Sequence, residues 1–286
     1  MSKKLNQIKK VGFILRPNSP NILSLYNEIK LKFEDRGIEV FLDNISANMI
    51  EIEGIDFSLM CKEVDLLVSL GGDGTLLSLV RKSYGYDKPV LGINAGNLGF
   101  LADTPIDCVD EMIDRLIVGD YRIDNRMLIE GYIERKDGRE DFYAFNDVVI
   151  TRPTISHMVK IDASIDDDWF NTYRGDGLII STPTGSTAYN LSLGGPIMYP
   201  LSKGFIMTPV APHSLTQRPL VVPNDFTINL TSPDELVVMV DGQDDYSLKA
   251  TEKLVIGGAS MSAKLLHKKE HSYFKVLREK LSWGDE

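Results

Sequence analysis

The 286-residue sequence predicts an α/β domain with a parallel sheet, followed by a mostly antiparallel β domain. Up to about residue 121, apolar runs alternate with helical patterns, which is typical of βαβ units. Beyond that residue, polar and apolar residues alternate and turn sequences separate the runs, which is typical of hairpins. We therefore expect an α/β domain over residues 1–121, a β-rich domain over 122–266, and a C-terminal helical segment, 267–286, that packs back on the body.

The first domain is predicted from buried strands and the helices between them. Apolar runs indicate strands at residues 11–15, 38–42, 66–70 and 89–93. Helical spacing of apolar side chains indicates helices around residues 23–33, 57–61, 75–82 and 106–118. Ligands of parallel sheets sit beyond the carboxyl ends of the strands, where the turns at residues 71–75 and 94–97 would lie.

The second domain is predicted from period-two patterns between turns. Strands over residues 127–133 and 142–150 flank a Lys136-Asp137-Gly138 turn and indicate a hairpin. Residues 159–165 alternate in the same way before an aspartate turn at 166–168. Further strands are predicted at 178–181, 226–230, 236–240 and 254–256, and a short amphipathic helix at 273–281.

Composition excludes several classes of function. The formal charge of −10 and the lack of a basic tract argue against a nucleic-acid partner. No apolar stretch is long enough to span a bilayer and the N-terminus has no signal core, so we expect a cytoplasmic protein without a membrane partner. Cys61 and Cys108 are far apart in helical patterns and are expected to be small core residues.

The turn Gly71-Gly72-Asp73-Gly74-Thr75 is the most informative segment of the chain. It joins a buried strand to a helix for which Thr75 is a candidate N-cap, and its glycines let backbone N–H groups approach an anion. A carboxylate beside phosphate suggests either magnesium coordination or capture of a proton from an attacking hydroxyl. The motif therefore indicates phosphoryl transfer. The structural alternative is a tight turn in which Asp73 only caps the helix, and the Walker A and dinucleotide-binding spacings are both absent.

Two further segments offer polar groups to a ligand. In Asn146-Asp147, an amide and a carboxylate either grip adjacent ribose hydroxyls or make local turn hydrogen bonds. The hydroxyl-rich segment 181–189 ends at Tyr189, which could stack on a base, and Arg174 lies upstream, where it could meet a phosphate. The alternative for this segment is an ST-turn with a well-capped helix.

The sequence alone does not predict a metal site at the histidines. His267-Lys268-Lys269-Glu270-His271 matches an H-x-x-E-H pattern, but the lysines and the few following residues favour exposed or capping histidines. His157 and His213 stand alone and could be structural. Asp241-Gly242-Gln243 indicates a turn, in which Gln243 is a possible amide contact to a ligand.

Taken together, these segments resemble the NAD kinases. The first motif is shared with diacylglycerol kinases, sphingosine kinases and phosphofructokinases, whereas the block at 176–189 is far more specific. The motifs follow the family order in both halves of the chain: 71–75, 94–101, 146–147, 176–189, 194–196, 212–215 and 218–219.

The resemblance implies a reaction and a role for Asp73. Asp73 would accept the proton of the adenosine ribose 2′-hydroxyl of NAD, which attacks the γ-phosphoryl group of ATP and gives NADP and ADP. Mg²⁺ would neutralise the phosphates, held by them alone or with Asp73 as a ligand. The residues that would cradle the phosphates are Gly71, Gly72, Gly74 and Thr75.

The resemblance also implies an NAD site, with Tyr189 near the adenine and Asp176 near the nicotinamide. Its residues would be Asp73, Gly74, Asn146, Asp147, His157, Arg174, Asp176, Thr187, Ala188, Tyr189, Asn190, Leu191, Ser192 and Gln243. The family usually has Asn-Glu where this chain has Asn146-Asp147, so the shorter side chain makes a longer or water-mediated ribose contact. Arg174 favours ATP over inorganic polyphosphate as the donor.

A second subunit can complete sites of this family, which implies a homodimer or homotetramer. Two other interpretations compete with that of an NAD kinase. A lipid or sugar kinase could use the same glycine turn, although the 176–189 block counts against it. A non-catalytic NAD(P)-binding regulator would keep the binding residues without turnover, although the intact Asp73 turn counts against it.

Overall fold

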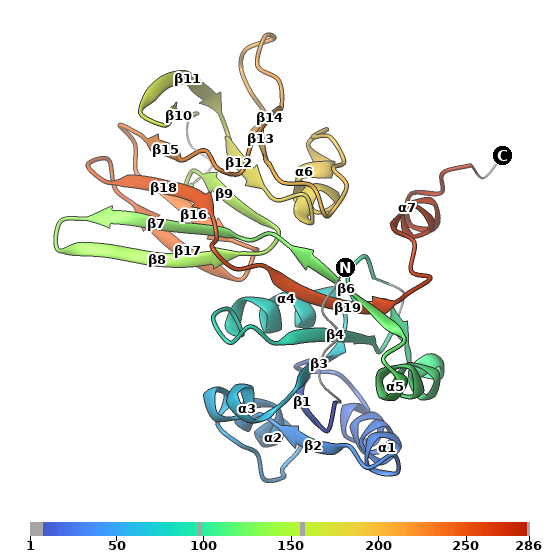
Figure 1. Cartoon of the computed structure of the whole chain (residues 1–286). Coiled ribbons are helices and arrows are strands. Elements are labelled where there is room, and N and C mark those ends of the chain that lie inside the picture. Colours follow the sequence, from blue (N-terminus) through green and yellow to red (C-terminus); the bar gives the residue numbers. More distant parts are fainter. Residues whose placement is uncertain (1–7, 97–98, 155–157, 285–286) are drawn as a thin grey trace. The chain divides into compact units, whose positions relative to one another are not determined.

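The computed structural model describes residues 8–96, 99–154 and 158–284, which form two compact units (Figure 1). Unit 1 comprises Met1–Asn125 and Ala263–Glu286, and unit 2 comprises Arg126–Ser262. Strands β6 (Tyr121–Arg126) and β19 (Ala263–Lys268) are neighbours in the sheet of unit 1, so the chain enters and leaves unit 2 through this pair. Among the described residues, no helix is long and apolar enough to cross a membrane.

The sheet of unit 1 confirms the predicted α/β architecture with a mainly parallel sheet. Its strand order is β2-β1-β3-β4-β19-β6, and β5 pairs with β4. Pairings of β1 with β2 and β3, of β3 with β4, and of β4 with β5 and β19 are all parallel. The remaining strands are β1 (Lys10–Leu15), β2 (Glu39–Leu42), β3 (Leu66–Gly71), β4 (Pro89–Asn94) and β5 (Thr104–Pro105).

Helices cover both faces of this sheet. On one face, apolar side chains of α1 (Ile22–Glu34) and α5 (Val109–Val118) share one buried cluster with alternate residues of β1, including Val11 and Phe13. On the other face, a Cβ at Gly12 would meet Met60 of α3 (Phe57–Glu63), and one at Gly92 would meet Leu76 of α4. The other helical segments of unit 1 are α2 (Asn44–Met49), α4 (Asp73–Lys82), η1 (Ile106–Cys108) and α7 (Tyr273–Leu281).

Unit 2 is built from two six-stranded sheets, and every pairing within them is antiparallel, as predicted. One sheet has the order β11-β10-β15-β18-β7-β8 and the other β14-β13-β12-β9-β16-β17. A single apolar cluster contains side chains from both sheets, so the two sheets pack face to face. The bounds are β7 (Ile129–Arg135), β8 (Gly138–Ala144), β9 (Asp147–Thr151), β10 (Val159–Ile165), β11 (Asp168–Gly175), β12 (Gly177–Ser181), β13 (Phe205–Val210), β14 (Leu220–Val222), β15 (Ile228–Thr231), β16 (Leu236–Val240), β17 (Asp244–Leu248) and β18 (Lys253–Gly258), with η2 (Gly185–Thr187) and α6 (Tyr189–Ser192) after β12.

The predicted strand over residues 142–150 is two strands. β8 ends at Ala144 and β9 begins at Asp147, and the two belong to different sheets. The break is held by Asp241, whose carboxylate accepts the backbone N–H groups of Phe145, Asn146 and Asp147. Those N–H groups are thereby satisfied without a strand partner, which lets the chain change sheets at this point.

Candidate active site

In unit 1, the Gly71–Thr75 turn joins β3 directly to α4. The helix begins at Asp73 with Gly72 as its N-cap residue, and the N–H groups of Thr75 and Leu76 bond to the Gly72 carbonyl at 3.1 and 3.2 Å. The prediction of Thr75 as the N-cap is therefore wrong, because the N-cap is Gly72, three residues earlier. Thr75 is buried against Gly71, where a Cβ would collide with its hydroxyl.

The carboxylate of Asp73 is held by three successive backbone N–H groups. Phe100 donates to Oδ2 at 2.8 Å, and Leu101 and Ala102 donate to Oδ1 at 3.1 and 2.9 Å. A carboxylate has about four acceptor positions, so three are filled from the described residues and the fourth, on Oδ2, is left. Asp73 is thus fixed in orientation and retains one acceptor position, and the alternative role as a simple helix cap does not describe it.

Gly99 allows the loop to wrap around this carboxylate. A Cβ at Gly99 would overlap Oδ1 of Asp73 and would lie 2.6 Å from its Cγ. The loop is also closed on itself, because the Ala102 carbonyl accepts the Gly99 N–H at 3.3 Å and the Asn94 side-chain amide at 3.2 Å. We call residues 99 to 102 the 99–102 loop. Sequence spacing did not indicate that this loop holds Asp73.

Gly72 and Gly74 differ from Gly71 in having open surroundings. Apart from the chain neighbours of each glycine and the backbone of α4 itself, no described atom lies within 4 Å of the position of a Cβ at either residue. Gly72 has an ordinary extended backbone with φ −120° and ψ −167°. Packing and backbone conformation therefore do not require glycine at either position. Bare backbone at the N-terminus of a ten-residue helix, by contrast, is suited to the approach of a phosphate.

In unit 2, Asn146 and Asp147 lie at one end of the central strands of a sheet. Asp147 begins β9 and pairs with Ser181 at the end of β12, and Val240 at the end of β16 pairs with Val148. Asn146 therefore lies before β9, at the break in the strand that was predicted over residues 142–150. The turn that carries Asp241 follows β16 at the same end, so its carboxylate reaches the three N–H groups described above at 2.7–2.9 Å.

Asp147 is a buried acid, 5% exposed. Desolvation, and then the charge of Asp241, raise the pKa of Asp147 to about 7. No hydrogen bond to its carboxyl oxygens is found among the described residues. A carboxyl group in this setting exchanges its proton near neutral pH and is able either to donate a hydrogen bond or to accept one.

The hydroxyl-rich segment after β12 folds over Asn146. The Thr182 hydroxyl donates to the Phe145 carbonyl at 2.6 Å, the Thr182 N–H donates to the Asn146 carbonyl at 2.8 Å, and a Cβ at Gly185 would collide with that carbonyl. Tyr189, which follows, is 45% exposed and is available for stacking. The remaining predicted residues of this segment are Thr187 and Ala188, half-buried beside η2, and Leu191 and Ser192 in α6.

Asn190 has a structural role that the sequence did not indicate. It is fully buried, its amide donates to the carbonyls of Ser186 and Pro196, and its oxygen accepts the Thr208 hydroxyl at 2.6 Å. These bonds use both amide hydrogens, so Asn190 shapes the segment from inside. Gln243 is exposed in the turn after Asp241, whereas His157 lies outside the described residues.

Asp176 and Arg174 lie at the opposite end of β12 from Asn146 and Asp147. Asp176 precedes Gly177, and four residue steps of about 3.4 Å separate Gly177 from Ser181, a distance of about 14 Å. The Asp176 carboxylate pairs with Arg152 at 3.1 Å, a partner that the sequence did not indicate. Within one unit 2, therefore, the structure does not bring all the predicted NAD-binding residues together.

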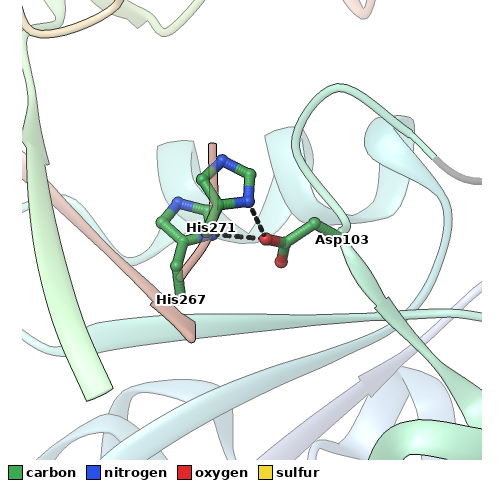
Figure 2. Close-up of side chains that lie close together, drawn as sticks. All are labelled: Asp103, His267 and His271. Atoms are coloured by element: carbon green, nitrogen blue, oxygen red, sulfur yellow. Dashed lines mark hydrogen bonds and ion pairs between the residues drawn. The ribbon is translucent and has the colours of Figure 1, made fainter. Parts of the chain in front are cut away.

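The two histidines of the H-x-x-E-H pattern are buried together in unit 1 (Figure 2). Their side chains are only 2% and 8% exposed, and both rings bond to the carboxylate of Asp103, itself 9% exposed. The prediction of exposed or capping histidines is wrong, because His267 is a buried residue of β19 and His271, in the turn that follows, stacks on it and bonds to the same carboxylate. Glu270 does not join them and pairs with Arg115 at 3.1 Å.

Comparison with known proteins decides the family. Residues 11–121 match the model of the ATP-NAD kinase N-terminal domain, and residues 145–268 match that of the ATP-NAD kinase C-terminal domain. The chain belongs to the NAD kinase family. It is 50% identical to the NAD kinase of Wolinella succinogenes over 100% of this chain and 99% of that protein, and 50% identical to that of Sulfurimonas denitrificans over 97% and 98%.

Solved structures of NAD kinases share the fold. The yeast NADH kinase complexed with NADH superposes with a TM-score of 0.90 at 25% identity, covering 98% of this chain and 89% of that one. An NAD kinase from Archaeoglobus fulgidus in complex with ATP superposes with a TM-score of 0.76 at 22% identity, covering 96% and 98%. The resemblance inferred from the motifs is thereby confirmed, and so is the predicted fold class.

Proposed function

We propose that this NAD kinase transfers the γ-phosphoryl group of ATP to the 2′-hydroxyl of the adenosine ribose of NAD, with Asp73 as the acceptor of the hydroxyl proton. The observation that carries the proposal is the geometry of Asp73. Three backbone N–H groups orient its carboxylate and leave one acceptor position on Oδ2, which a ribose hydroxyl can use.

Placement matters more than basicity in this reaction. In a loose phosphoryl-transfer transition state the metaphosphate-like group forms early, so the hydroxyl needs to lose its proton only late. In the proposed step the ribose oxygen forms a bond to the γ-phosphorus, the bond from that phosphorus to the bridging oxygen breaks, ADP leaves, and the proton passes to Asp73. A carboxylate fixed within hydrogen-bond reach of the hydroxyl suffices for this transfer.

The phosphates of ATP are proposed to approach Gly72 and Gly74. The open space at both glycines and the N-terminus of α4 support this assignment. Gly71 and Thr75 support the turn from beneath, because they pack on each other. The resemblance implied that all four residues cradle the phosphates; we propose that Gly72 and Gly74 contact them directly and that Gly71 and Thr75 act through the packing of the turn.

Magnesium is the proposed divalent ion, and the donor set of the turn favours binding through phosphate oxygens. Asp73 has one acceptor position left among the described residues, and a proton acceptor cannot use the same position to ligate Mg²⁺. Bound to the phosphates, Mg²⁺ supplies positive charge that offsets the charge developing on the transferred group. Asp73 is left for the hydroxyl.

Unit 2 is proposed to bind NAD around Asn146, Asp147 and Tyr189. Asp147 is positioned by backbone bonds from its own segment to Asp241, and its buried carboxyl faces no protein donor among the described residues. A pair of ribose hydroxyls would satisfy it. Tyr189 is exposed for stacking on adenine. The predicted set also keeps Thr187, Ala188, Leu191, Ser192, Gln243 and His157.

We further infer a homodimer or homotetramer. Asp176 and Arg174 lie about 14 Å along β12 from Asp147, so within one unit 2 they do not share the ribose site. In an oligomer, Asp176 and Arg174 of one subunit can reach the nicotinamide end of the NAD that another subunit binds. This arrangement would explain why both residues belong to the predicted NAD site. The cytoplasm, which supplies ATP and NAD, is the proposed location.

The test is NADP formation by purified protein supplied with NAD, ATP and Mg²⁺, with phosphorus NMR to locate the phosphate on the product. We expect a 2′-phosphomonoester and ADP in equal amounts. Tight NADP binding without product would instead support a non-catalytic regulator. Phosphorylation of a lipid or sugar in place of NAD would support the other kinase alternative.

A further inference from the structure

The 99–102 loop that holds Asp73 is followed immediately by the buried cluster of Asp103, His267 and His271. Asp103 is the next residue after Ala102, whose N–H is one of the three donors to Asp73. The Asp103 carboxylate points toward two imidazole rings from the C-terminal part of unit 1 (Figure 2). The loop thus lies between two carboxylates, one at its donors and one at its end.

The cluster is bonded through a single oxygen. Nδ1 of His267 lies 2.9 Å and Nδ1 of His271 lies 2.6 Å from Oδ2 of Asp103, and the rings stack with centroids 4.4 Å apart at 14°. A carboxylate oxygen only accepts, so both Nδ1 atoms carry the hydrogen. Burial alone would raise the pKa of Asp103, but the two histidines hold it well below the usual range. Asp103 is therefore a charged acceptor.

The same three side chains are also a possible metal-ligand set, since their ligating atoms lie within 4.8 Å of one another. Zinc–nitrogen and zinc–oxygen bonds of about 2.1 Å at a tetrahedral angle would separate the nitrogen and oxygen ligands by about 3.4 Å. The observed separations of 2.6 and 2.9 Å are shorter and are those of direct hydrogen bonds. The geometry favours a hydrogen-bonded clamp over a metal site.

Both histidines come from a segment that is itself firmly held. His267 is in β19, next to β4 and β6, and its Nε2 lies 3.8 Å from Asp124 of β6. His271 immediately precedes Ser272, whose hydroxyl caps α7. The clamp therefore joins the residue that follows the 99–102 loop to β19 and to the start of α7.

We propose that Asp103, clamped by His267 and His271, is a positioning residue that fixes the 99–102 loop so that its N–H groups hold Asp73 for the transfer. This inference rests on the proposed role of Asp73. Three donors from successive residues converge on one carboxylate only while the backbone between them keeps its shape, and the clamp anchors that backbone at its last residue. Asp103 acts through the loop and touches no substrate.

The test compares Asp103→Ala, Asp103→Asn and His271→Ala with the wild type in NADP formation. We expect kcat to fall by about 10²-fold in Asp103→Ala, the loss associated with a misplacement of about 1 Å. KM for NAD should change less than about twofold, because all the proposed NAD residues except Asp73 and Gly74 are in unit 2. Asp103→Asn keeps an acceptor oxygen and should recover part of kcat. His271→Ala leaves the bond between Asp103 and His267 in place. This variant serves as the test if Asp103→Ala does not fold.

A matched control is Asp43→Ala. Asp43 is also buried in unit 1, 4% exposed, and its carboxylate accepts the N–H groups of Ile45 and Ser46, away from the 99–102 loop. We expect this variant to lower Tm and leave kcat within about twofold of wild type. An equal loss of kcat in Asp43→Ala and Asp103→Ala at equal Tm would overturn the proposal, because it would show a purely structural role.

Amide hydrogen exchange separates this proposal from the role of Asp73. Exchange at Leu101 and Ala102 should become faster in Asp103→Ala and stay unchanged in Asp43→Ala. Faster exchange with an unchanged kcat would overturn the positioning role, whereas a failure of Asp73 itself is detected by Asp73→Asn. Co²⁺ added to wild-type protein should give no visible absorption band from this cluster. A band that His271→Ala abolishes would overturn the clamp in favour of a metal site.

Discussion

Replacing Gly99 with alanine should displace the carboxylate of Asp73 and remove most of the turnover. The added Cβ would lie 2.6 Å from Cγ and 2.9 Å from Oδ2 of Asp73, whereas carbon atoms in contact are about 3.5–4.0 Å apart. The carboxylate or the loop must therefore move by about 1 Å. A shift of this size costs about 10²-fold in rate, or about 2.7 kcal/mol of transition-state stabilisation.

The assay is the initial rate of NADP formation at saturating NAD and ATP, with Tm measured in parallel. Gly96→Ala is the matched control, because among the described residues that are not its chain neighbours the nearest atom to its added Cβ is Asn94 Oδ1 at 3.9 Å. We expect Gly96→Ala to keep kcat within about threefold of wild type. A Gly99→Ala enzyme with wild-type kcat would refute the argument that the loop must wrap closely around Asp73.

Three other variants test separate parts of the account. Gly72→Ala should raise KM for ATP about tenfold with little change in Tm, since its Cβ enters open space; an unchanged KM would remove the phosphate from this position. Tyr189→Ala should raise KM for NAD more than KM for ATP, and equal effects in steady-state kinetics would indicate packing instead. The pKa of Asp147 is raised from 3.8 to about 7, so its burial leaves stability unchanged below pH 4 and lowers it as pH rises from 4 to 7. Asp147→Asn removes that penalty. In urea unfolding, the free energy of unfolding of the variant relative to wild type should rise by roughly 4 kcal/mol between pH 4 and pH 8. A difference that does not change with pH would contradict the pKa shift.

Local sequence patterns predicted the helices and strands well, because these elements are determined largely by residues close together in the sequence. The apolar run at 66–70 lies in β3, which extends one residue further to Gly71, and the amphipathic pattern at 273–281 is α7 with the same bounds. The family and the fold class followed from motifs that span both halves of the chain, and both are confirmed. The turn chemistry of Gly71–Thr75 was visible, although the helix begins at Asp73.

Contacts between distant residues were invisible to the same patterns. Asp241 resembled an ordinary turn residue, yet it accepts N–H groups 94 to 96 residues away and thereby splits the strand predicted at 142–150. His267 was expected at the surface because lysines follow it, yet it bonds to Asp103, 164 residues earlier. The remaining NAD-site residues stay predictions, as the fold alone does not show which of them touch a ligand.

The most direct test of the central claim is the rate of NADP formation by Asp73→Asn. Asparagine keeps the size of the side chain and an oxygen for the N–H groups of Leu101 and Ala102. It replaces the oxygen that accepts the Phe100 N–H, and it cannot take up the hydroxyl proton. Because general-base catalysis contributes about 10²–10⁴-fold, we expect kcat to fall by that factor while calorimetry shows NAD affinity within about threefold of wild type. A near-normal kcat in Asp73→Asn would contradict the assignment of Asp73 as proton acceptor.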